Sequence, residues 1–364
     1  MLDPSFWRHR RVYLTGHTGF KGAWMTLILR HLGANVCGIA LAPEGPSDLF
    51  LAADVARSVD NVIGDIRDPD LVKKSLVDAE PDILIHMAAQ SLVRRSYSEP
   101  VATYATNVMG TVNVLNAVSQ QSSVRAAVIV TSDKCYEHGR GTRPFRETDA
   151  LGGHDPYSNS KACAELVTDA YRRSFFHGKN TAAIASVRAG NVIGGGDWAL
   201  DRLVPDAMRA FIAREVLRVR NPSAVRPWQH VLDPVLAYLS LAHHLFEYGH
   251  LFAEAWNFGP GPDSEVSVSQ VADRVAQLWG AGARWERDGG QHPHEAILLK
   301  LDCEKAKTRL GWRPAIGLEE ALRLTVDWYR SFDRKFDMRD LTLEQIEFGL
   351  AATRTLNYTG SRIT

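Results

Sequence analysis

Gly16-His17-Thr18-Gly19-Phe20-Lys21-Gly22 is the stretch that decides the fold. It follows the apolar run Arg11–Leu14 directly and leads into a helical stretch, Ala23–Leu32. The first two glycines let the backbone turn tightly and approach a pyrophosphate, and the third lets the helix pack closely on the strand. The helix N-terminus favours anionic phosphates. We therefore predict a dinucleotide site whose contacts come from Gly16, Thr18, Gly19, Phe20, Lys21 and Gly22.

Short apolar runs alternate with amphipathic stretches over the first 190 or so residues. The runs are continuous and aliphatic, which is typical of parallel strands covered on both faces. We expect an α/β fold with a doubly wound parallel sheet of the Rossmann type. After about Gly194 glycine, proline and tryptophan become frequent, which predicts a smaller C-terminal α/β lobe that binds substrate. We assign 1–190 to the nucleotide domain, with the catalytic residues, and 191–364 mainly to the lobe, with some chain returning to the large domain. The expected strands are Arg11–Leu14, Asn35–Leu41, Ile83–Met87, Ala126–Thr131 and Thr181–Arg188.

The totals exclude several classes of protein. Lys and Arg number 42, as do Asp and Glu, so the 364-residue chain has no basic excess for nucleic acid or a membrane surface. Its four cysteines are far apart and lack metal-ligand spacing, which is typical of buried thiols in a reducing compartment. Met1-Leu2-Asp3-Pro4 is not an apolar leader. We expect a soluble cytoplasmic protein without a metal site.

The second expected strand bears on the choice of cofactor. It ends in Ala42-Pro43 without an acid for the adenosine ribose, and the first acid is Glu44. Because no arginine stands ready for a 2′-phosphate, NAD is preferred over NADP. Asp65 is a candidate adenine contact, although a plain turn aspartate is an equal alternative. The remaining candidate cofactor contacts are Ile66, Ala88, Ala89, Gln90, Asn107 and Thr131.

Tyr157 and Lys161 lie four residues apart and therefore share one face of a helix. A tyrosine has a reference pKa near 10, which is too high for a base at neutral pH. We expect the lysine ammonium and a positive nicotinamide ring to lower that pKa. Ser132 can donate a hydrogen bond to the same substrate oxygen.

Asp133 and Lys134 follow an apolar strand, at the edge where parallel sheets bind ligands. A surface salt bridge is one interpretation. The other is elimination chemistry, because oxidation of carbon 4 of a hexose acidifies the proton on carbon 5. Lys134 with a lowered pKa can remove that proton, and Asp133 kept protonated by desolvation can donate to the departing 6-hydroxyl. The lysines nearby oppose protonation of Asp133, and the sequence leaves the balance open.

Three longer segments resemble the CDP-glucose 4,6-dehydratases, a group of extended short-chain dehydrogenases/reductases that includes sugar-nucleotide dehydratases and epimerases. The segments are residues 131–137 (TSDKCYE), 155–161 (DPYSNSK) and 188–198 (RAGNVIGGGDW). The similarity runs over nearly the whole chain, including 226–231 and 256–260.

This resemblance implies that NAD is recycled on CDP-glucose, with loss of water, to give CDP-4-dehydro-6-deoxy-D-glucose for deoxysugar synthesis of the O-antigen type. It implies that Tyr157 is the base for the 4-hydroxyl, Lys161 its partner and ribose ligand, Ser132 the third member, and Asp133 the acid. Lys134 stands where dTDP-glucose dehydratases place a glutamate, so its role as carbon-5 base departs from their pattern.

The C-terminal lobe is expected to hold the sugar nucleotide. Arg218 and Arg226 suit a diphosphate, although either arginine is also plausible as a solvated surface residue. Trp228 and Trp198 can stack on a base or fill the core, and core is preferred for Trp198. His230 is preferred as a packed or hydrogen-bonding histidine. The candidate substrate contacts are Ser91, Asn191, Arg202, Leu203, Arg218, Arg226, Gln229 and His230.

Helices over Val101–Ser119 and Tyr157–Phe176 carry apolar residues at helical spacing. In the superfamily such helices form a four-helix interface, which implies a homodimer, with a tetramer as the alternative. The rival functions are another nucleotide-sugar dehydratase, acting on dTDP- or GDP-sugars, and a UDP-sugar 4-epimerase, which needs no acid–amine pair. A non-catalytic dinucleotide sensor is a third alternative.

Overall fold

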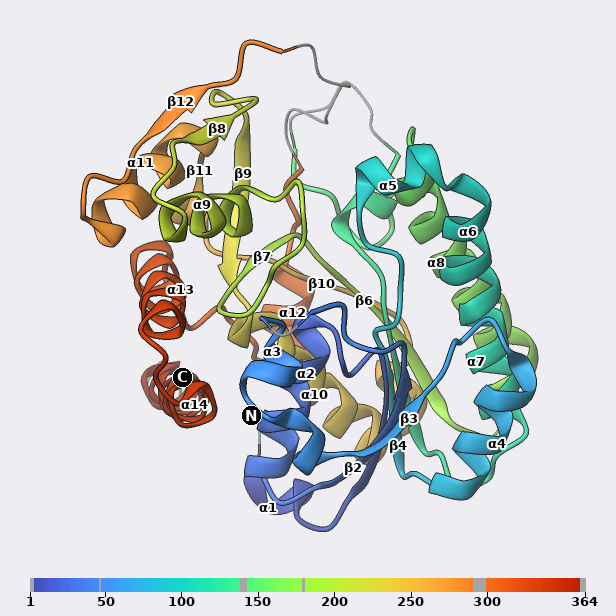
Figure 1. Cartoon of the computed structure of the whole chain (residues 1–364). Helices are drawn as coiled ribbons and strands as arrows, with labels where there is room; N and C mark the ends of the chain where they lie inside the picture. Colours follow the sequence, from blue (N-terminus) through green and yellow to red (C-terminus); the bar gives the residue numbers. More distant parts are fainter. Residues whose placement is uncertain (1–2, 46, 138–142, 179–180, 291–298, 361–364) are drawn as a thin grey trace.

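A seven-stranded parallel sheet forms the centre of the computed structural model, which describes residues 3–45, 47–137, 143–178, 181–290 and 299–360 (Figure 1). The strand order is β10-β6-β5-β4-β1-β2-β3. Strand β1 pairs in parallel on both sides, with Val12 opposite Val36 and Ile83. The doubly wound α/β prediction is therefore confirmed. The strands are β1 (Arg11–Thr15), β2 (Asn35–Ala40), β3 (Asp60–Ile63), β4 (Ile83–His86), β5 (Ala126–Val130), β6 (Ala183–Ala189) and β10 (Ala255–Phe258).

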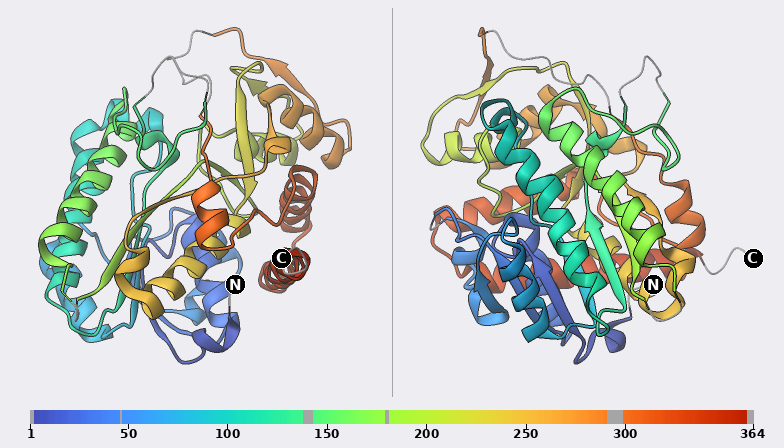
Figure 2. Two further views of the ribbon diagram at one scale, coloured as in Figure 1. Left: turned by 180° about the vertical axis from the view of Figure 1, so that it is seen from behind. Right: turned by 90° about the vertical axis from the view of Figure 1, so that its right-hand side faces the viewer.

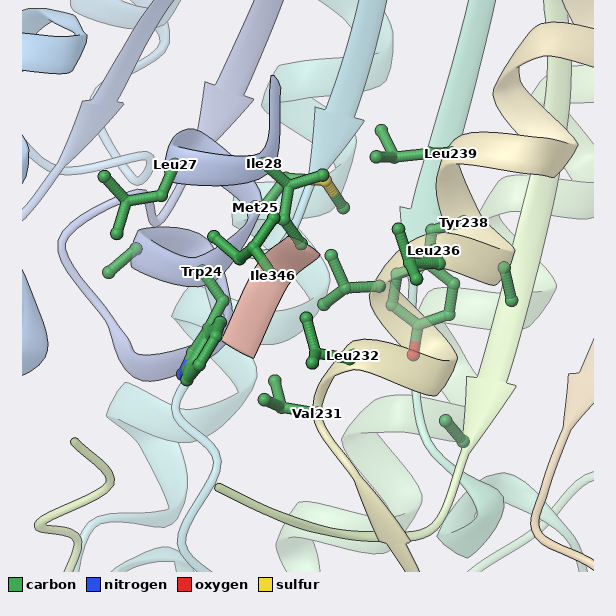
Figure 3. Packing of buried hydrophobic residues seen from close by; sticks show 14 of the residues in the cluster. Trp24, Met25, Leu27, Ile28, Val231, Leu232, Leu236, Tyr238, Leu239 and Ile346 are labelled. Carbon is green, nitrogen blue, oxygen red and sulfur yellow. The ribbon is translucent and has the colours of Figure 1, made fainter. Parts of the chain in front are cut away.

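Two layers of helices bury the faces of this sheet. One face is covered by α2 (Phe20–His31) and α10 (Leu232–Tyr248), whose Trp24, Leu232 and Leu236 pack together around Ile346 (Figure 3). The other face is covered by α4 (Pro69–Ala79), α7 (Gly110–Ser119) and α8 (Pro156–Phe175). The inner strands β4 and β5 are buried along their whole length and consist almost entirely of aliphatic residues, as expected for parallel strands covered on both faces.

Local signals fix the ends of the helices beside the site. Asp155 caps α8, its carboxylate accepting from the Ser158 amide at 2.9 Å, and Pro156 follows in the first turn. The expected helix over 101–119 is divided into α6 (Pro100–Tyr104), the π-helical turn η2 (Ala105–Met109) and α7. Single π turns are frequent at functional sites.

The smaller lobe lies beyond the carboxyl ends of the large sheet (Figure 1). It holds a three-stranded sheet, β11-β9-β7, and a two-stranded one, β12-β8. β10 and α10 return to the large sheet, while the domain boundary at residue 190 stays a prediction. The lobe's elements are β7 (Asn191–Ile193), α9 (Leu203–Ile212), β8 (Leu217–Val219), β9 (Val225–His230), β11 (Glu265–Ser267), α11 (Val268–Trp279) and β12 (Trp285–Arg287).

The C-terminal part of the chain adds two long helices, α13 (Leu318–Asp333) and α14 (Met338–Gly360). Figure 2 shows them on the flank opposite α7 and α8. Across the described ranges, no helix is both long and apolar enough to cross a bilayer. The remaining short elements are α1 (Pro4–Trp7), α3 (Leu49–Ala52), η1 (Val55–Ser58), α5 (Val93–Ser98), η3 (Asp133–Cys135), η4 (Gly249–Phe252), η5 (Pro262–Ser264) and α12 (Glu304–Arg309).

Candidate active site

The turn between β1 and α2 fits a dinucleotide diphosphate. Gly16 has φ of 77°, and a Cβ there would lie 2.8 Å from the Ala88 Cα. A Cβ on Gly22 would lie 2.1 Å from the Gly16 carbonyl oxygen. Gly19, at the N-cap of α2, provides no side-chain acceptor to the amides of the first turn. Those amides and the helix dipole are therefore available to an anion.

Other predicted cofactor residues lie around this turn. The Thr18 hydroxyl donates to the Leu41 carbonyl at 2.8 Å. Asn107, in the π turn, holds Gln90 at both ends, accepting from its amide at 2.8 Å and donating to its carbonyl at 2.9 Å. Asn107 also donates to Ser160 Oγ at 2.9 Å. The π turn thus connects the end of β4 to the helix that carries Tyr157 and Lys161.

Asp65 and the end of β2 are the positions predicted to meet the adenosine. Asp65 forms a turn in which its carboxylate accepts from the Arg67 amide at 2.8 Å and pairs with the guanidinium at 2.6 Å. That hydrogen bonding lowers the pKa of Asp65. Ile66 is buried beneath Gly110. β2 ends at Ala40 without an acid, and Asp48 turns back to accept from the Glu44 amide at 2.8 Å.

Ser132, Asp133 and Lys134 form a tight turn at the carboxyl end of β5. Ser132 caps η3, its Oγ accepting from the Lys134 amide at 3.2 Å and donating to Asp133 Oδ1 at 3.0 Å. Asp133 is 4% exposed, and a Cβ on Gly190 would lie 2.7 Å from its Oδ2. The salt-bridge alternative on an open surface therefore does not describe Asp133.

The sequence left open whether the pKa of Asp133 is raised or lowered, and the structure gives its direction. Burial raises the pKa of Asp133, and this effect exceeds the opposing charges of Lys134, Lys21 and Arg226. A carboxyl with a raised pKa retains its proton to higher pH, as a general acid requires.

Tyr157 and Lys161 lie on the buried face of α8, beside the η3 turn. Lys161 Nζ donates to the Val130 carbonyl at 3.3 Å. Burial and the charge of Lys21 lower the pKa of Lys161 to about 8. Burial raises the pKa of Tyr157 to about 12, although a hydrogen bond with Ser132 opposes this rise. Among the protein's own groups, desolvation of the phenolate outweighs the lowering effects of Ser132 and Arg202. The lowering expected from Lys161 together with a positive nicotinamide ring stays a prediction.

Some of the predicted substrate residues converge on this centre. Arg202 lies close enough to Tyr157 and Lys21 to perturb their pKa values, and Arg226 does the same to Asp133. Arg202 pairs with Asp197 at 2.9 Å and donates to Ser91 Oγ at 3.1 Å. Asn191 is half-buried on β7, and Leu203 begins α9.

Others lie apart from it. Arg218 is on β8 and pairs with Glu286 of β12 at 2.9 Å, both side chains being at least half exposed. Gln229 is fully buried and donates to the Phe258 carbonyl at 3.3 Å. His230 is fully buried against Trp24, and burial lowers its pKa to about 3. The structure shows no contact between any of these three residues and the η3 turn that carries Ser132, Asp133 and Lys134, so their role in binding stays a prediction.

A buried ion pair beneath the catalytic turn was not found from the sequence. Glu165, one helical turn after Lys161, accepts from Thr131 Oγ1 at 2.5 Å and from Arg188 at 2.8 Å. Arg188 also donates to the Tyr136 hydroxyl at 2.7 Å, and that hydroxyl donates to Asn257 Oδ1 at 2.7 Å. Burial acts to raise the pKa of Glu165, but Arg188 outweighs it and holds the pKa below its usual value. A signal was present, because Arg188 interrupts an otherwise apolar strand.

Among the residues that the structure describes, no three histidine, cysteine or acidic side chains are grouped as metal ligands. The site brings Ser132, Tyr157 and Lys161 together beside the dinucleotide loop. Their combination on a doubly wound sheet defines the class, an extended short-chain dehydrogenase/reductase that acts on a carbon–oxygen bond.

The comparisons with known proteins define the family more closely. The model of the GDP-mannose 4,6 dehydratase family matches residues 14–325, and the chain belongs to this family. It is 48% identical to the CDP-glucose 4,6-dehydratase of Salmonella typhimurium, over 97% of this chain and 99% of that protein. It is 28% identical to the dTDP-glucose 4,6-dehydratase of Xanthomonas campestris, over 87% and 92% of the two chains.

The solved structures agree on the fold. The UDP-glucose 4-epimerase of Thermus thermophilus, in complex with NAD, superposes with a TM-score of 0.75 at 25% identity, covering 88% of this chain and 99% of that one. The epimerase of Brucella ovis, also with NAD, gives 0.74 at 22% identity, covering 87% and 97%.

Proposed function

We propose that this protein is a CDP-glucose 4,6-dehydratase, an NAD-dependent hydro-lyase. The observation that carries the proposal is the buried Asp133, whose pKa is raised and which lies hydrogen-bonded to Ser132 beside Tyr157. An epimerase needs no such acid, because it eliminates nothing. The 48% identity to the Salmonella typhimurium dehydratase supports the choice of CDP-glucose among nucleotide sugars.

The side chains divide the proton transfers. When bound, NAD would supply the acceptor for the hydride from carbon 4 and the donor of the hydride to carbon 6. Tyr157 takes the proton of the 4-hydroxyl, Ser132 holds the same oxygen, and Lys161 contacts the ribose and favours the phenolate. Lys134 takes the proton of carbon 5, which the 4-ketone acidifies, and gives it back to carbon 5 when the hydride adds to carbon 6. Asp133 gives its proton to the 6-hydroxyl, which leaves as water. The net change is the loss of one water molecule, giving CDP-4-dehydro-6-deoxy-D-glucose.

Turnover of four nucleotide-glucose donors tests this proposal. Purified protein is incubated with NAD and CDP-, dTDP-, GDP- or UDP-glucose, and the 4-keto product is followed by its absorbance in alkali and by mass. We expect loss of water from CDP-glucose at a kcat/KM far above that of the other donors. A new epimer of unchanged mass, or a clear preference for another base, would reject it.

Asp133→Asn tests the division of labour. The variant lacks the acid for water loss, so we expect a fall in dehydration of roughly 100-fold or more. Exchange of the carbon-5 hydrogen with deuterated solvent depends on oxidation and on Lys134, and is expected to fall much less. Equal loss of both signals would assign Asp133 to an earlier step.

We further infer that the protein is a cytoplasmic homodimer serving deoxysugar synthesis of the O-antigen type. Four free cysteines support a reducing compartment. Exposed apolar residues along the outer helices support dimerisation, since Val101 on α6 is 82% exposed and Leu166 on α8 is 58% exposed. Leu115, within the 101–119 stretch expected at the interface, is fully buried in the core of the protomer instead.

A further inference from the structure

The segment from Gly194 to Arg202 joins the catalytic centre to the C-terminal helices. It begins after β7 and ends at α9, so it has no strand or helix of its own to fix it. Trp24 of α2 donates to the Gly195 carbonyl at 3.0 Å. A Cβ on Gly195 would lie 2.0 Å from Trp328 Cγ, so this backbone rests directly on the indole of α13.

Tyr329, the next residue of α13, fixes the segment from the same side. Its side chain is fully buried, and its hydroxyl donates to the Asp197 carbonyl at 2.5 Å. Trp198 packs edge-on against the Tyr329 ring, with centroids 5.0 Å apart. A buried hydroxyl on a backbone carbonyl leaves Asp197 one position relative to α13.

Asp197 transmits that position to Arg202. Its carboxylate, only 4% exposed with the rest of the residue, accepts from Arg202 at 2.9 Å. The charge of Asp197 raises the pKa of Arg202 and keeps the guanidinium charged. The other end of the same guanidinium donates to Ser91, in the loop after β4. Arg202 therefore bridges the two lobes beside Tyr157.

Tyr329 and the helix α14 that supports α13 lie beyond the part of the chain that matches the family model, which ends at residue 325. Trp328 Nε1 donates to Thr342 Oγ1 of α14 at 3.0 Å, and Gln345 of α14 donates to the Leu324 carbonyl at 2.9 Å. Ile346 of α14 is fully buried between α2 and α10 (Figure 3). The helix pair is thus fixed to the nucleotide-binding part of the molecule.

We propose that Tyr329 is a positioning residue for the sugar nucleotide: through Asp197 it sets the Arg202 guanidinium that receives the diphosphate. This inference rests on the proposed function for the identity of the ligand. Its chemistry needs only an anionic nucleotide diphosphate, because a guanidinium held at both ends presents its remaining donors in one orientation.

Tyr329→Phe tests the relay, because it keeps the ring against Trp198 and removes only the hydroxyl. We expect KM for CDP-glucose to rise about fivefold, the size of one lost hydrogen bond, with kcat within about twofold of the parent. Tyr248→Phe, an exposed tyrosine on α10, is the matched control and is expected to change neither. An unchanged KM in Tyr329→Phe would overturn the inference.

A double mutant separates positioning from general stability. In an Arg202→Ala background, Tyr329→Phe is expected to add nothing to KM, whereas equal increments in both backgrounds would overturn the relay. The dissociation constant for CDP, measured by calorimetry, gives the same comparison without turnover. If the parent is inactive, the proposed function is rejected, and the CDP dissociation constants alone decide this inference. If Tyr329→Phe fails to fold, Asp197→Asn tests the same relay one step nearer to Arg202.

Discussion

The Asp133 carboxyl is enclosed by its two neighbours Ser132 and Gly190. Its Oδ1 accepts from Ser132 at 3.0 Å, while its Oδ2 lies against the Cα of Gly190. The carboxyl is enclosed by backbone on that side, which removes water from it and raises its pKa. A methyl group at residue 190 would lie only 2.7 Å from Oδ2, so the carboxyl would have to move.

We therefore expect Gly190→Ala to displace the acid while the fold persists. Its predicted result is a fall in kcat of roughly 10- to 100-fold, since misplacement of a catalytic group by about 1 Å costs that much. Steady-state kinetics and far-UV circular dichroism measure the two effects. Gly261→Ala, where a Cβ meets nothing within 4 Å, is the control. Full activity in Gly190→Ala would mean that Asp133 does not need this position.

At the scale of elements, the Glu165–Arg188 pair joins α8 to β6 beneath the catalytic turn. Both side chains are almost completely buried. Removing one charge leaves the other buried and unpaired, so Glu165→Gln is expected to lower the free energy of unfolding by about 3 kcal/mol. Chemical denaturation measures this loss. Asp78→Asn, which breaks the exposed Lys74–Asp78 pair, is expected to cost less than about 1 kcal/mol. Similar small losses in both variants would contradict the prediction.

The buried Asp233 of α10 makes the stability of the protein depend on pH. It is 3% exposed and accepts from the Ala315 amide at 2.8 Å, and burial raises its pKa to about 7. The folded chain therefore holds a proton that the unfolded chain releases near its ordinary pKa of 3.8. This contribution to stability is complete below that value and is lost as pH rises toward 7.

Asp233→Asn is expected to remove this dependence. Thermal unfolding of parent and variant from pH 5 to pH 8 should show the variant gaining stability relative to the parent as pH rises. Parallel curves across that interval would show that Asp233 does not titrate as described. Asp340→Asn, near the start of α14, serves as the control substitution.

The elements show what the sequence could predict. Aliphatic runs, glycines 16, 19 and 22, and the Asp–Pro helix starts are local signals, so the parallel sheet, the loop and α8 could be predicted. The strands β3 and β10 were not among the expected strand ranges. The pKa of Tyr157 and the partner of Arg202 were not predictable, because they depend on burial and on contacts between residues far apart in the chain. Arg202 meets Ser91 across 111 positions. The π turn at Asn107 has no sequence pattern of its own in the expected helix.

At the scale of the whole molecule, α6 and α8 lie on the side that faces the viewer in the right-hand view of Figure 2. Val101 on α6 and Leu166 on α8 are exposed apolar residues. Leu166→Glu puts a charge on that surface, so we expect the parent to be a dimer and the variant a monomer by light scattering at micromolar concentration. Circular dichroism should be unchanged. Leu251→Glu, at an exposed leucine of η4 on another element, is expected to stay dimeric. A monomeric parent would reject the homodimer.

The contact of Gly16 with Ala88 has a consequence for how this enzyme can evolve. Since neither Gly16 nor Gly22 has room for even a methyl group, selection cannot adjust cofactor affinity gradually at those positions. Any lineage that alters its preference for a dinucleotide must do so through the flanking side chains, above all at the end of β2, where Leu41 is largely exposed. We therefore expect changes in cofactor preference to arise at the side chains around the loop and not at these two glycines.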